Sequence, residues 1–197
     1  MAAAALKPLT VEDLARELAR RPDARLELIE GSISENEAPV YEHGDAQFGL
    51  GHPLRGSFHR RGPRDDGTGG WWIVPEVDIQ LNDHNIVRPD IAGWRRDRHP
   101  SPPTNQWPVR ARPDWVCEIV SPGSVRRDQV VKRRLYAESG VEWYWLVHLA
   151  GQFIEVLHLQ NGSYTIAADA LPIPDARLPP FDAVAIDLRP AFGIEEE

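Results

Sequence analysis

Hydrophobic and polar positions follow the clearest pattern in the middle of the chain, where they predict a strand, a helix and a second strand in succession. β-Branched and aromatic residues are frequent at 114–120, and the Ser-Pro-Gly sequence at 121–123 ends this strand. Ser124 is a favourable N-cap, so we expect a helix of about four turns that ends at Gly140. The apolar run at 141–149 predicts a second buried strand.

Glu118 is the informative residue of this central unit. Strand alternation places it on one face with Val116 and Val120, where a carboxylate without a partner is costly to bury. The strand from 118 to 121 spans about 10 Å, and the helix from 125 to 132 rises about 10 Å. A helix that folds back along the strand therefore brings Lys132 level with Glu118.

The N-terminal part of the chain gives weaker signals. A capping box at 10–13 predicts a first helix that ends near Arg21. The strand predicted at 25–34 carries Glu30 just before a glycine. Residues 35–57 hold several glycines, and they indicate a second helix only weakly.

A hairpin is predicted in the next part of the chain. The Gly- and charge-rich segment 60–70 matches no phosphate-loop spacing, so we interpret it as a connection. A strand at 71–81, a turn at 82–85 and a returning strand at 86–94 follow. Asp90 lies in the returning strand, directly after a proline.

The remaining segments complete a sheet. The proline-rich segment 95–112 is expected to be irregular. After the central unit, we expect strands at 153–159 and 163–167 with an Asn-Gly turn between them, and a final strand at 183–188. Helices occur early and in the middle of this series of strands, so we predict a mixed α/β fold in a single domain over 1–197.

Composition limits the class of protein. The chain has 197 residues and 42% hydrophobic content, which suffices for one substantial core. It contains no apolar run near the roughly 20 residues of a membrane span, and its start lacks the pattern of a signal peptide. The single cysteine, Cys117, is interpreted as a small buried strand residue. A reducing cytoplasm is therefore the expected location.

Charge is distributed unevenly along the chain. The formal net charge is −8, yet residues 88–134 carry eleven basic and five acidic side chains, so this segment is +6 and the rest is −14. A local basic patch is what contact with phosphates requires, although a solvated arginine-rich face would give the same pattern. The helix of the central unit supplies the candidates for phosphate contact, Arg126, Arg127 and Arg133. Two of them lie in its first turn, where the helix dipole disfavours cations.

The candidate chemistry rests on carboxylates. Asp90 and Glu118 come from strands that we expect to be central, Lys132 comes from a helix, and Glu30 is a fourth candidate. Two carboxylates about 4 Å apart repel by roughly 1 to 4 kcal/mol, so they stay ionised together only beside a cation. Mg²⁺ meets this need and suits hydrolysis of a phosphodiester, whereas the structural alternative is a buried ion pair between Glu118 and Lys132. The seven histidines show no regular pairing that would indicate a histidine metal cage.

Four ordered motifs resemble the Uma-type family of bacterial restriction-endonuclease-like proteins, which belong to the PD-(D/E)XK nuclease superfamily. The motifs are Val-Arg-Pro-Asp-Ile-Ala-Gly-Trp-Arg-Arg at 87–96, Pro-Asp-Trp-Val-Cys-Glu-Ile-Val-Ser-Pro-Gly-Ser at 113–124, Asp-Gln-Val-Val-Lys-Arg-Arg-Leu-Tyr at 128–136, and Gly-Val-Glu-Trp-Tyr-Trp-Leu-Val at 140–147. The resemblance covers nearly the whole chain. It implies a restriction-endonuclease-like core with a mixed central sheet flanked by helices and additional C-terminal antiparallel strands.

The resemblance also implies a metal-dependent DNA endonuclease with Mg²⁺ or Mn²⁺ as cofactor. Asp90 and Glu118 match the two acidic positions and would bind the metal. The superfamily lysine normally stands two residues after the second acid, where this chain has Val120. The resemblance implies that the lysine is displaced onto the next helix as Lys132, where it would assist attack by water. Glu30 matches the N-terminal acid, an extra ligand or a water-positioning group.

Two departures from the family pattern concern the rim of the site. This chain has His148 where many relatives have aspartate, and Gly123 where a small polar residue is common. Relatives with this fold often pair, so a homodimer is expected. Two alternatives stay open: a catalytically inactive nucleic-acid-binding or assembly module, and a hydrolase of a smaller phosphodiester. The sequence also leaves open the choice between DNA and RNA, and the roles of His43, His52 and His59.

Overall fold

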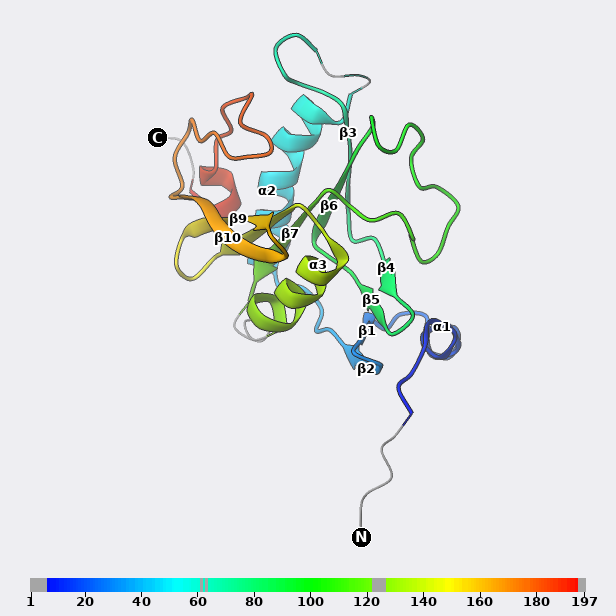
Figure 1. The fold of residues 1–197 in the computed structure, drawn as a ribbon. Helices are drawn as coiled ribbons and strands as arrows, with labels where there is room; N and C mark the ends of the chain where they lie inside the picture. Colours follow the sequence, from blue (N-terminus) through cyan, green and yellow to red (C-terminus); the bar gives the residue numbers. More distant parts are fainter. Residues whose placement is uncertain (1–6, 61, 63, 122–126, 195–197) are drawn as a thin grey trace.

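The computed structural model describes residues 7–60, 62, 64–121 and 127–194 (Figure 1). Within these ranges the strands form a six-stranded main sheet and a four-stranded small sheet. The main sheet has the order β10-β9-β8-β7-β6-β3, and its strands are Trp71–Pro75 (β3), Ile91–Arg95 (β6), Trp115–Val120 (β7), Trp143–His148 (β8), Phe153–Gln160 (β9) and Ser163–Ala170 (β10). β7 and β8 pair in parallel and the other neighbours are antiparallel, which confirms the predicted mixed sheet with C-terminal antiparallel strands.

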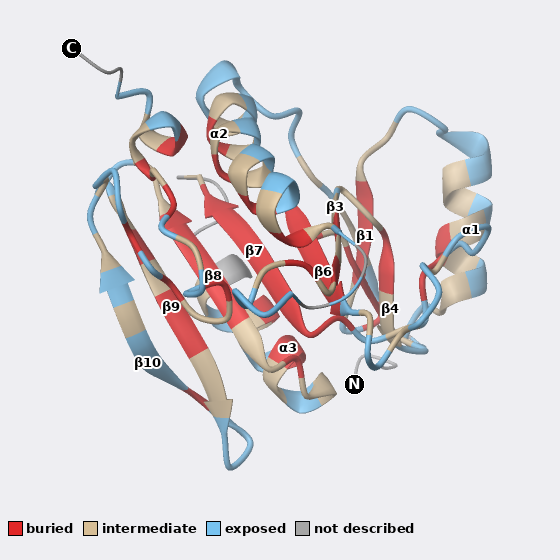
Figure 2. Ribbon diagram, turned by 90° about the horizontal axis from the view of Figure 1, so that it is seen from above, coloured by how far each residue is buried: buried red, intermediate tan, exposed pale blue. Residues whose placement is uncertain are grey.

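Helices cover both faces of the main sheet. Helix α2 (Tyr41–Phe58) packs on one face, and α3 (Arg133–Ser139) packs on the other after a π-helical segment η1 (Arg127–Lys132). β7 is buried along its whole length, as Figure 2 shows. The side chains of β7 alternate between the two cores as predicted: Trp115, Cys117 and Ile119 belong to the core under α2, and Val116 and Val120 to the core under α3.

The small sheet lies beside the main sheet and carries the first helix. Its order is β2-β1-β5-β4, with strands Leu26–Ile29 (β1), Ser32–Glu35 (β2), Ile79–Asn82 (β4) and Asn85–Val87 (β5). Helix α1 (Val11–Arg20) begins with the predicted capping box and buries Leu14 against Leu26 and Leu28. The predicted hairpin turn at 82–85 joins β4 to β5.

Three predicted strands are each divided in two. The strand predicted at 86–94 gives β5 in the small sheet and β6 in the main sheet, and Asp90 lies between them. The strand predicted at 25–34 is a hairpin, because Glu30 (φ 51°) and Gly31 (φ 72°) form a left-handed turn. A Cβ at Gly31 would lie 2.5 Å from the side chain of Pro8, so the close approach of the chain also requires glycine. The strand predicted at 71–81 breaks after Pro75, where Glu76 has φ 54°, and its halves enter different sheets as β3 and β4.

The final predicted strand, 183–188, is wrong. This segment makes an isolated bridge between Ala176 and Ile186, and a 3-10 helix, η2 (Arg189–Phe192), follows it. The apolar residues that suggested a strand are buried for another reason, since Ile186 and Leu188 pack into the core under α2. Tertiary burial of a loop thus gave the hydrophobic signal of a strand.

The weakly indicated second helix is confirmed as α2. Its sequence is poor for a helix, with four glycines and Pro53 inside the helix. Ala46, Leu50, Leu54 and Phe58 nevertheless recur at every fourth position and are all buried against the main sheet. Packing of these four residues against the main sheet stabilises the helix, although the local helix propensity of its sequence is low.

The helix of the central unit ends at Gly140 as predicted, in the left-handed conformation with φ 75°. The start predicted at Ser124 lies outside the described residues, and so does Arg126. No described helix combines the length and the apolar character that crossing a bilayer requires.

Candidate active site

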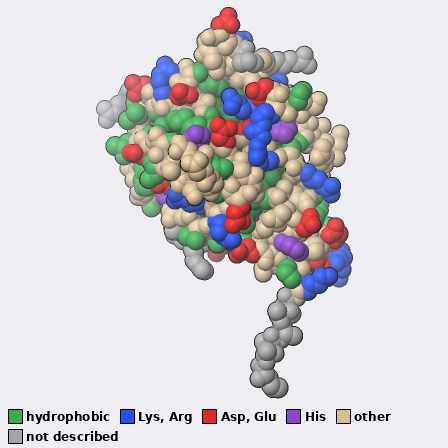
Figure 3. Space-filling model, in the orientation of Figure 1, with side chains coloured by type: hydrophobic (Ala, Val, Ile, Leu, Met, Phe, Trp, Pro, Cys, Tyr) green, Lys and Arg blue, Asp and Glu red, His purple; other side chains and the backbone are tan. Residues whose placement is uncertain are grey.

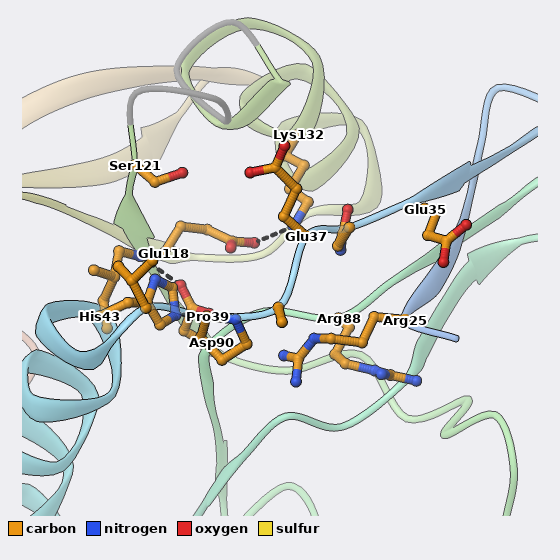
Figure 4. A pocket seen from close by; sticks show the side chains of 14 residues that line it. Arg25, Glu35, Glu37, Pro39, His43, Arg88, Asp90, Glu118, Ser121 and Lys132 are labelled. Atoms are coloured by element: carbon orange, nitrogen blue, oxygen red, sulfur yellow. Dashed lines mark hydrogen bonds and ion pairs between the residues drawn. The ribbon is translucent and has the colours of Figure 1, made fainter. Parts of the chain in front are cut away.

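A pocket of about 240 Å³ lies where the end of β7 approaches the small sheet and the start of α2 (Figure 4). Asp90, Glu118 and Lys132 all line it. These residues come from the segment before β6, from β7 and from the end of η1. The structure therefore brings together three of the four candidate catalytic residues.

Asp90 occupies its position because of the pairing between β6 and β7. Ile91 is opposite Cys117 in this antiparallel pair, so the residue just before β6 reaches the end of β7. The Asp90 Oδ2 atom accepts a hydrogen bond from the backbone N–H of Ile119 at 2.6 Å. The Asp90 Oδ1 atom lies 2.9 Å from Nε2 of His43 on α2. Asp90 is thus held from two sides, with its side chain only 12% exposed.

Lys132 lies level with Glu118, as the spacing along strand and helix predicts. The Lys132 Nζ atom is 3.0 Å from Oε1 of Glu118 and 3.0 Å from Oε1 of Glu27, and its side chain is 1% exposed. The hydroxyl of Tyr136 donates to the same Glu118 oxygen at 2.7 Å. Two carboxylates therefore compensate the ammonium group, which would be costly to bury alone.

The local chemistry keeps the neighbours of Glu118 protonated. Burial raises the pKa of Tyr136 well above its usual value, and the charge of Glu118 adds to this rise. The phenol therefore remains a hydrogen-bond donor. Burial likewise raises the pKa of Cys117, so its thiol remains protonated and fills the core as predicted.

Lys132 is delivered by an unusual element. It is the last residue of the π-helix η1, and it serves as the N-cap of α3. π-Helical turns are rare and often occur at functional sites. The chain contains only two lysines among 22 basic residues, and one of them is in this buried position.

The structure does not bring Glu30, the predicted N-terminal acid, into this cluster. Glu30 lies in the turn between β1 and β2, where its side chain is 53% exposed and forms an ion pair with Arg134 of α3. Glu27 takes the inner position instead. It accepts hydrogen bonds from the backbone N–H of Arg88 at 2.6 Å and from Nδ2 of Asn36 at 2.9 Å.

A sequence signal for Glu27 exists in retrospect. It is flanked along β1 by two buried leucines, as Glu118 is flanked along β7 by the buried residues Cys117 and Ile119. An isolated carboxylate in an otherwise apolar strand is costly unless it has a partner. This carboxylate was overlooked because the strand was predicted to continue through the turn at Glu30, so that Glu30 was taken as the acid of the strand.

Helix α2 contributes two residues that sequence reasoning did not assign to the site. His43 contacts Asp90, and Gln47, one turn later, donates from Nε2 to the backbone carbonyl of Asp90 at 2.7 Å. The hydrogen bond to Asp90 is the largest cause of a raised pKa for His43. Their spacing of four residues places both side chains on one face of the helix. This spacing is informative only if α2 is predicted, and the sequence indicates that helix weakly.

Glu76 completes a group of potential ligands around Asp90. Within the described part of the chain, His43, Glu76 and Asp90 each offer a ligand atom, and these atoms all lie within 4.8 Å of one another. Glu76 also forms an ion pair with Arg25. The group contains one histidine and two carboxylates, so it is a mixed donor set rather than a cage of histidines.

The comparisons with known proteins identify the family. A family model described as "Uma2: Putative restriction endonuclease" matches residues 11–181. The chain belongs to the Uma2 family. The resemblance found in the sequence motifs is thereby confirmed over most of the chain.

A solved structure shares the fold of this Uma2 protein. The crystal structure of "a putative nuclease belonging to DUF820 from Anabaena variabilis ATCC 29413" superposes with a TM-score of 0.70, covering 94% of this chain and 98% of that chain at 20% sequence identity. This likeness confirms the predicted nuclease-like fold. A search of curated proteins finds no match.

Basic side chains of the Uma2 protein also line the pocket. Arg25 and Arg88 lie on its small-sheet side (Figure 4). The Nε and Nη2 atoms of Arg88 bind the carboxylate of Asp78 at 2.7 and 2.9 Å, and this hydrogen bonding raises the pKa of Arg88. Arg25 is fixed by Glu76. Both guanidinium groups are held in place, as recognition of an anion requires.

The other predicted residues lie elsewhere or outside the described side chains. Arg133 is on α3, and its guanidinium donates to the backbone carbonyl of Tyr164 on β10 at 3.3 Å. Arg127 belongs to η1, but its side chain is outside the described part. His148 stacks on Phe153 with ring centroids 4.2 Å apart and does not line the pocket. His148 therefore contributes to packing between β8 and β9.

Proposed function

We propose that this Uma2 protein is a DNA endonuclease that hydrolyses phosphodiester bonds with Mg²⁺ or Mn²⁺ as cofactor. The observation that carries the proposal is the meeting of Asp90, Glu118 and Lys132 in one pocket, because a carboxylate pair beside a buried ammonium group suits phosphodiester hydrolysis. Family membership supports the same reaction class.

The residues present fit a divalent ion. Asp90, just before β6, and Glu118, on the adjacent strand β7, offer hard oxygen ligands, and the pocket between them and the small sheet is large enough for waters and a phosphate group. Asp90 and Glu118 would hold the ion. A bound Mg²⁺ or Mn²⁺ polarises a phosphate oxygen and lowers the pKa of a bound water.

The side chains around the ion position have separate roles. Lys132, fixed by Glu118 and Glu27, lines the pocket, where its ammonium group can orient the attacking water or donate to a phosphate oxygen as charge develops there. The backbone N–H of Ile119 orients Asp90. Arg25 and Arg88, both on the small-sheet side of the pocket, supply fixed cations for phosphate groups of the substrate beside the scissile bond. In this proposal Glu27 replaces Glu30 as the N-terminal acid of the site, and it orients Lys132, whereas the resemblance implied an extra ligand or a water-positioning group.

Calorimetric titration with Mg²⁺ tests the ligand set. We expect wild-type protein to bind Mg²⁺ and Glu118→Gln to bind it at least about 10- to 100-fold more weakly, because the substitution removes one of two carboxylate ligands. Glu138→Gln is the matched control, since Glu138 is an exposed acid on α3 that pairs only at the surface with Arg134.

Wild-type protein that takes up no Mg²⁺ at millimolar concentrations would contradict the proposal. The buried group of Glu27, Lys132 and Glu118 would then be a structural ion-pair network, and the inactive nucleic-acid-binding module would be the better interpretation.

A further inference from the structure

A second potential metal site lies on the α2 side of Asp90. His43, Glu76 and Asp90 come from three separate parts of the chain: the first turn of α2, the residue after β3, and the residue before β6. Their ligand atoms lie within 4.8 Å of one another. The side chains are sheltered but not sealed, with 15% exposure for His43, 27% for Glu76 and 12% for Asp90. An ion could therefore enter from solvent.

The backbone at Glu76 is held in an unfavourable conformation. Glu76 has φ 54°, in the left-handed region that is unfavourable for residues other than glycine. The conformation occurs where the chain leaves the main sheet and enters the small sheet. It places the Glu76 carboxylate in the group with His43 and Asp90, which a continuous strand from β3 to β4 would not do.

Neighbouring side chains hold this donor set in place. The Nε2 atom of Gln47 donates to the backbone carbonyl of Asp90 at 2.7 Å and to Oε1 of Glu76 at 3.4 Å. Arg25 binds Oε2 of Glu76. Ligands of bound metals are usually fixed by hydrogen bonds of this kind from surrounding residues. A carboxylate oxygen retains acceptor capacity after one such bond, so these contacts are compatible with metal binding.

We propose that His43, Glu76 and Asp90 form a binding site for a divalent transition metal, separate from the Glu118–Lys132 pair. The imidazole nitrogen suits Ni²⁺ or Zn²⁺ and the two carboxylates suit Mn²⁺, whereas Mg²⁺ prefers oxygen ligands and retained waters. The two oxygens of Asp90 face different neighbours, since Oδ1 lies toward His43 and Oδ2 toward β7. Asp90 would bind both this metal and the catalytic ion, and that shared role rests on the proposed function. The set of three ligands itself is independent of the proposed function.

Pulsed electron paramagnetic resonance of the Mn²⁺-loaded protein tests the site directly. We expect the electron spin echo to show a hyperfine coupling between Mn²⁺ and a nitrogen nucleus, because the imidazole nitrogen of His43 would be bound to the ion. His43→Gln should abolish the coupling and weaken Mn²⁺ binding at this site by at least about tenfold. Glutamine is chosen at this position because its amide keeps an N–H donor near Asp90. His52→Gln is the matched control, because His52 is an exposed histidine on the same helix, with its ring tilted against that of Phe48.

Two further variants separate this proposal from the proposed function. Glu118→Gln should retain the nitrogen coupling while it loses Mg²⁺ binding, and Glu76→Gln should weaken Mn²⁺ binding without changing the Mg²⁺ titration. The second metal site is overturned if His43→Gln keeps the coupling in a folded protein, or if Glu118→Gln removes it. Circular dichroism melting curves show whether each variant is folded, and Glu76→Gln supplies the test if His43→Gln is not.

Discussion

Lys132 is the residue on which the candidate site depends most. It is buried between Glu118 and Glu27, one from each sheet, so it joins the main sheet to the small sheet through a single ammonium group. A buried charge set of this kind gives little net stability, but removing one member leaves an uncompensated charge. The same contacts that would fix Lys132 in the proposed nuclease therefore make the two sheets depend on each other.

The different positions of Glu27 and Glu30 lead to a residue-scale prediction. Glu27→Gln should lower the free energy of unfolding by about 2–3 kcal/mol, because its new N–H₂ group must face either Asn36 or the pair of Lys132 and Arg88, and all three are donors. Glu30→Gln should change it by less than about 0.5 kcal/mol, because its ion pair with Arg134 is exposed. Urea denaturation of both variants measures the difference. Equal losses of stability would show that the assignment of the inner acid to Glu27 is wrong.

Some of the site could be predicted from local pattern and some could not. Glu118 and Lys132 follow from strand alternation and from the rise of a strand and a helix, and Asp90 follows from the family motif. Glu27 was missed because a left-handed turn at Glu30 ends its strand, and turns of this kind depend on contacts with Pro8 that local sequence does not specify. Glu76 was missed for the same reason, since its conformation is set by the junction of two sheets.

At the scale of elements, α2 shows how packing determines structure. Four glycines and a proline disfavour this helix, yet one stripe of its residues is buried and another carries His43 and Gln47 to the site. Gly49 lies against η2, where an added Cβ would be 2.8 Å from the backbone of Pro190. Gly56 faces open space, with no atom within 4 Å of an added Cβ.

The two glycines should respond oppositely to alanine. Gly56→Ala should raise the free energy of unfolding by about 0.5–1 kcal/mol, because alanine restricts the unfolded chain and favours the helix. Gly49→Ala should lower it by about 1–3 kcal/mol, because the backbone of η2 cannot move aside without loss of packing. Guanidinium denaturation measures both. Stabilisation by Gly49→Ala would contradict the close packing of α2 on η2.

The fold was predictable where elements are regular and local. The central strand, helix and strand, the C-terminal hairpin and the capping box of α1 follow from periodicity and turn residues. The split between β3 and β4 was not predictable, because the apolar pattern continues through Glu76 while the chain changes sheets. The apolar residues near Ile186 were misread because a buried loop has the same pattern as a strand.

Charge is the informative property of the whole molecule. Figure 3 shows acidic and basic side chains beside one another on the face in view rather than one uniform basic patch. Several arginines of the +6 segment pair with acids, as Arg88 does with Asp78 and Arg134 with Glu30. Contact with DNA would therefore depend on a few fixed guanidinium groups around the pocket more than on a broad field. The expected homodimer and cytoplasmic location stay predictions.

The most direct test of the proposed nuclease is nicking of supercoiled plasmid in Mg²⁺ and in Mn²⁺. We predict that wild-type protein converts the plasmid to the open circular form, that Glu118→Gln does so at least about 100-fold more slowly, and that Glu138→Gln matches the wild type. Chelation of the metal should stop the reaction. Nicking by Glu118→Gln at the wild-type rate, or no nicking by wild-type protein with either metal, would contradict a catalytic centre at Asp90, Glu118 and Lys132.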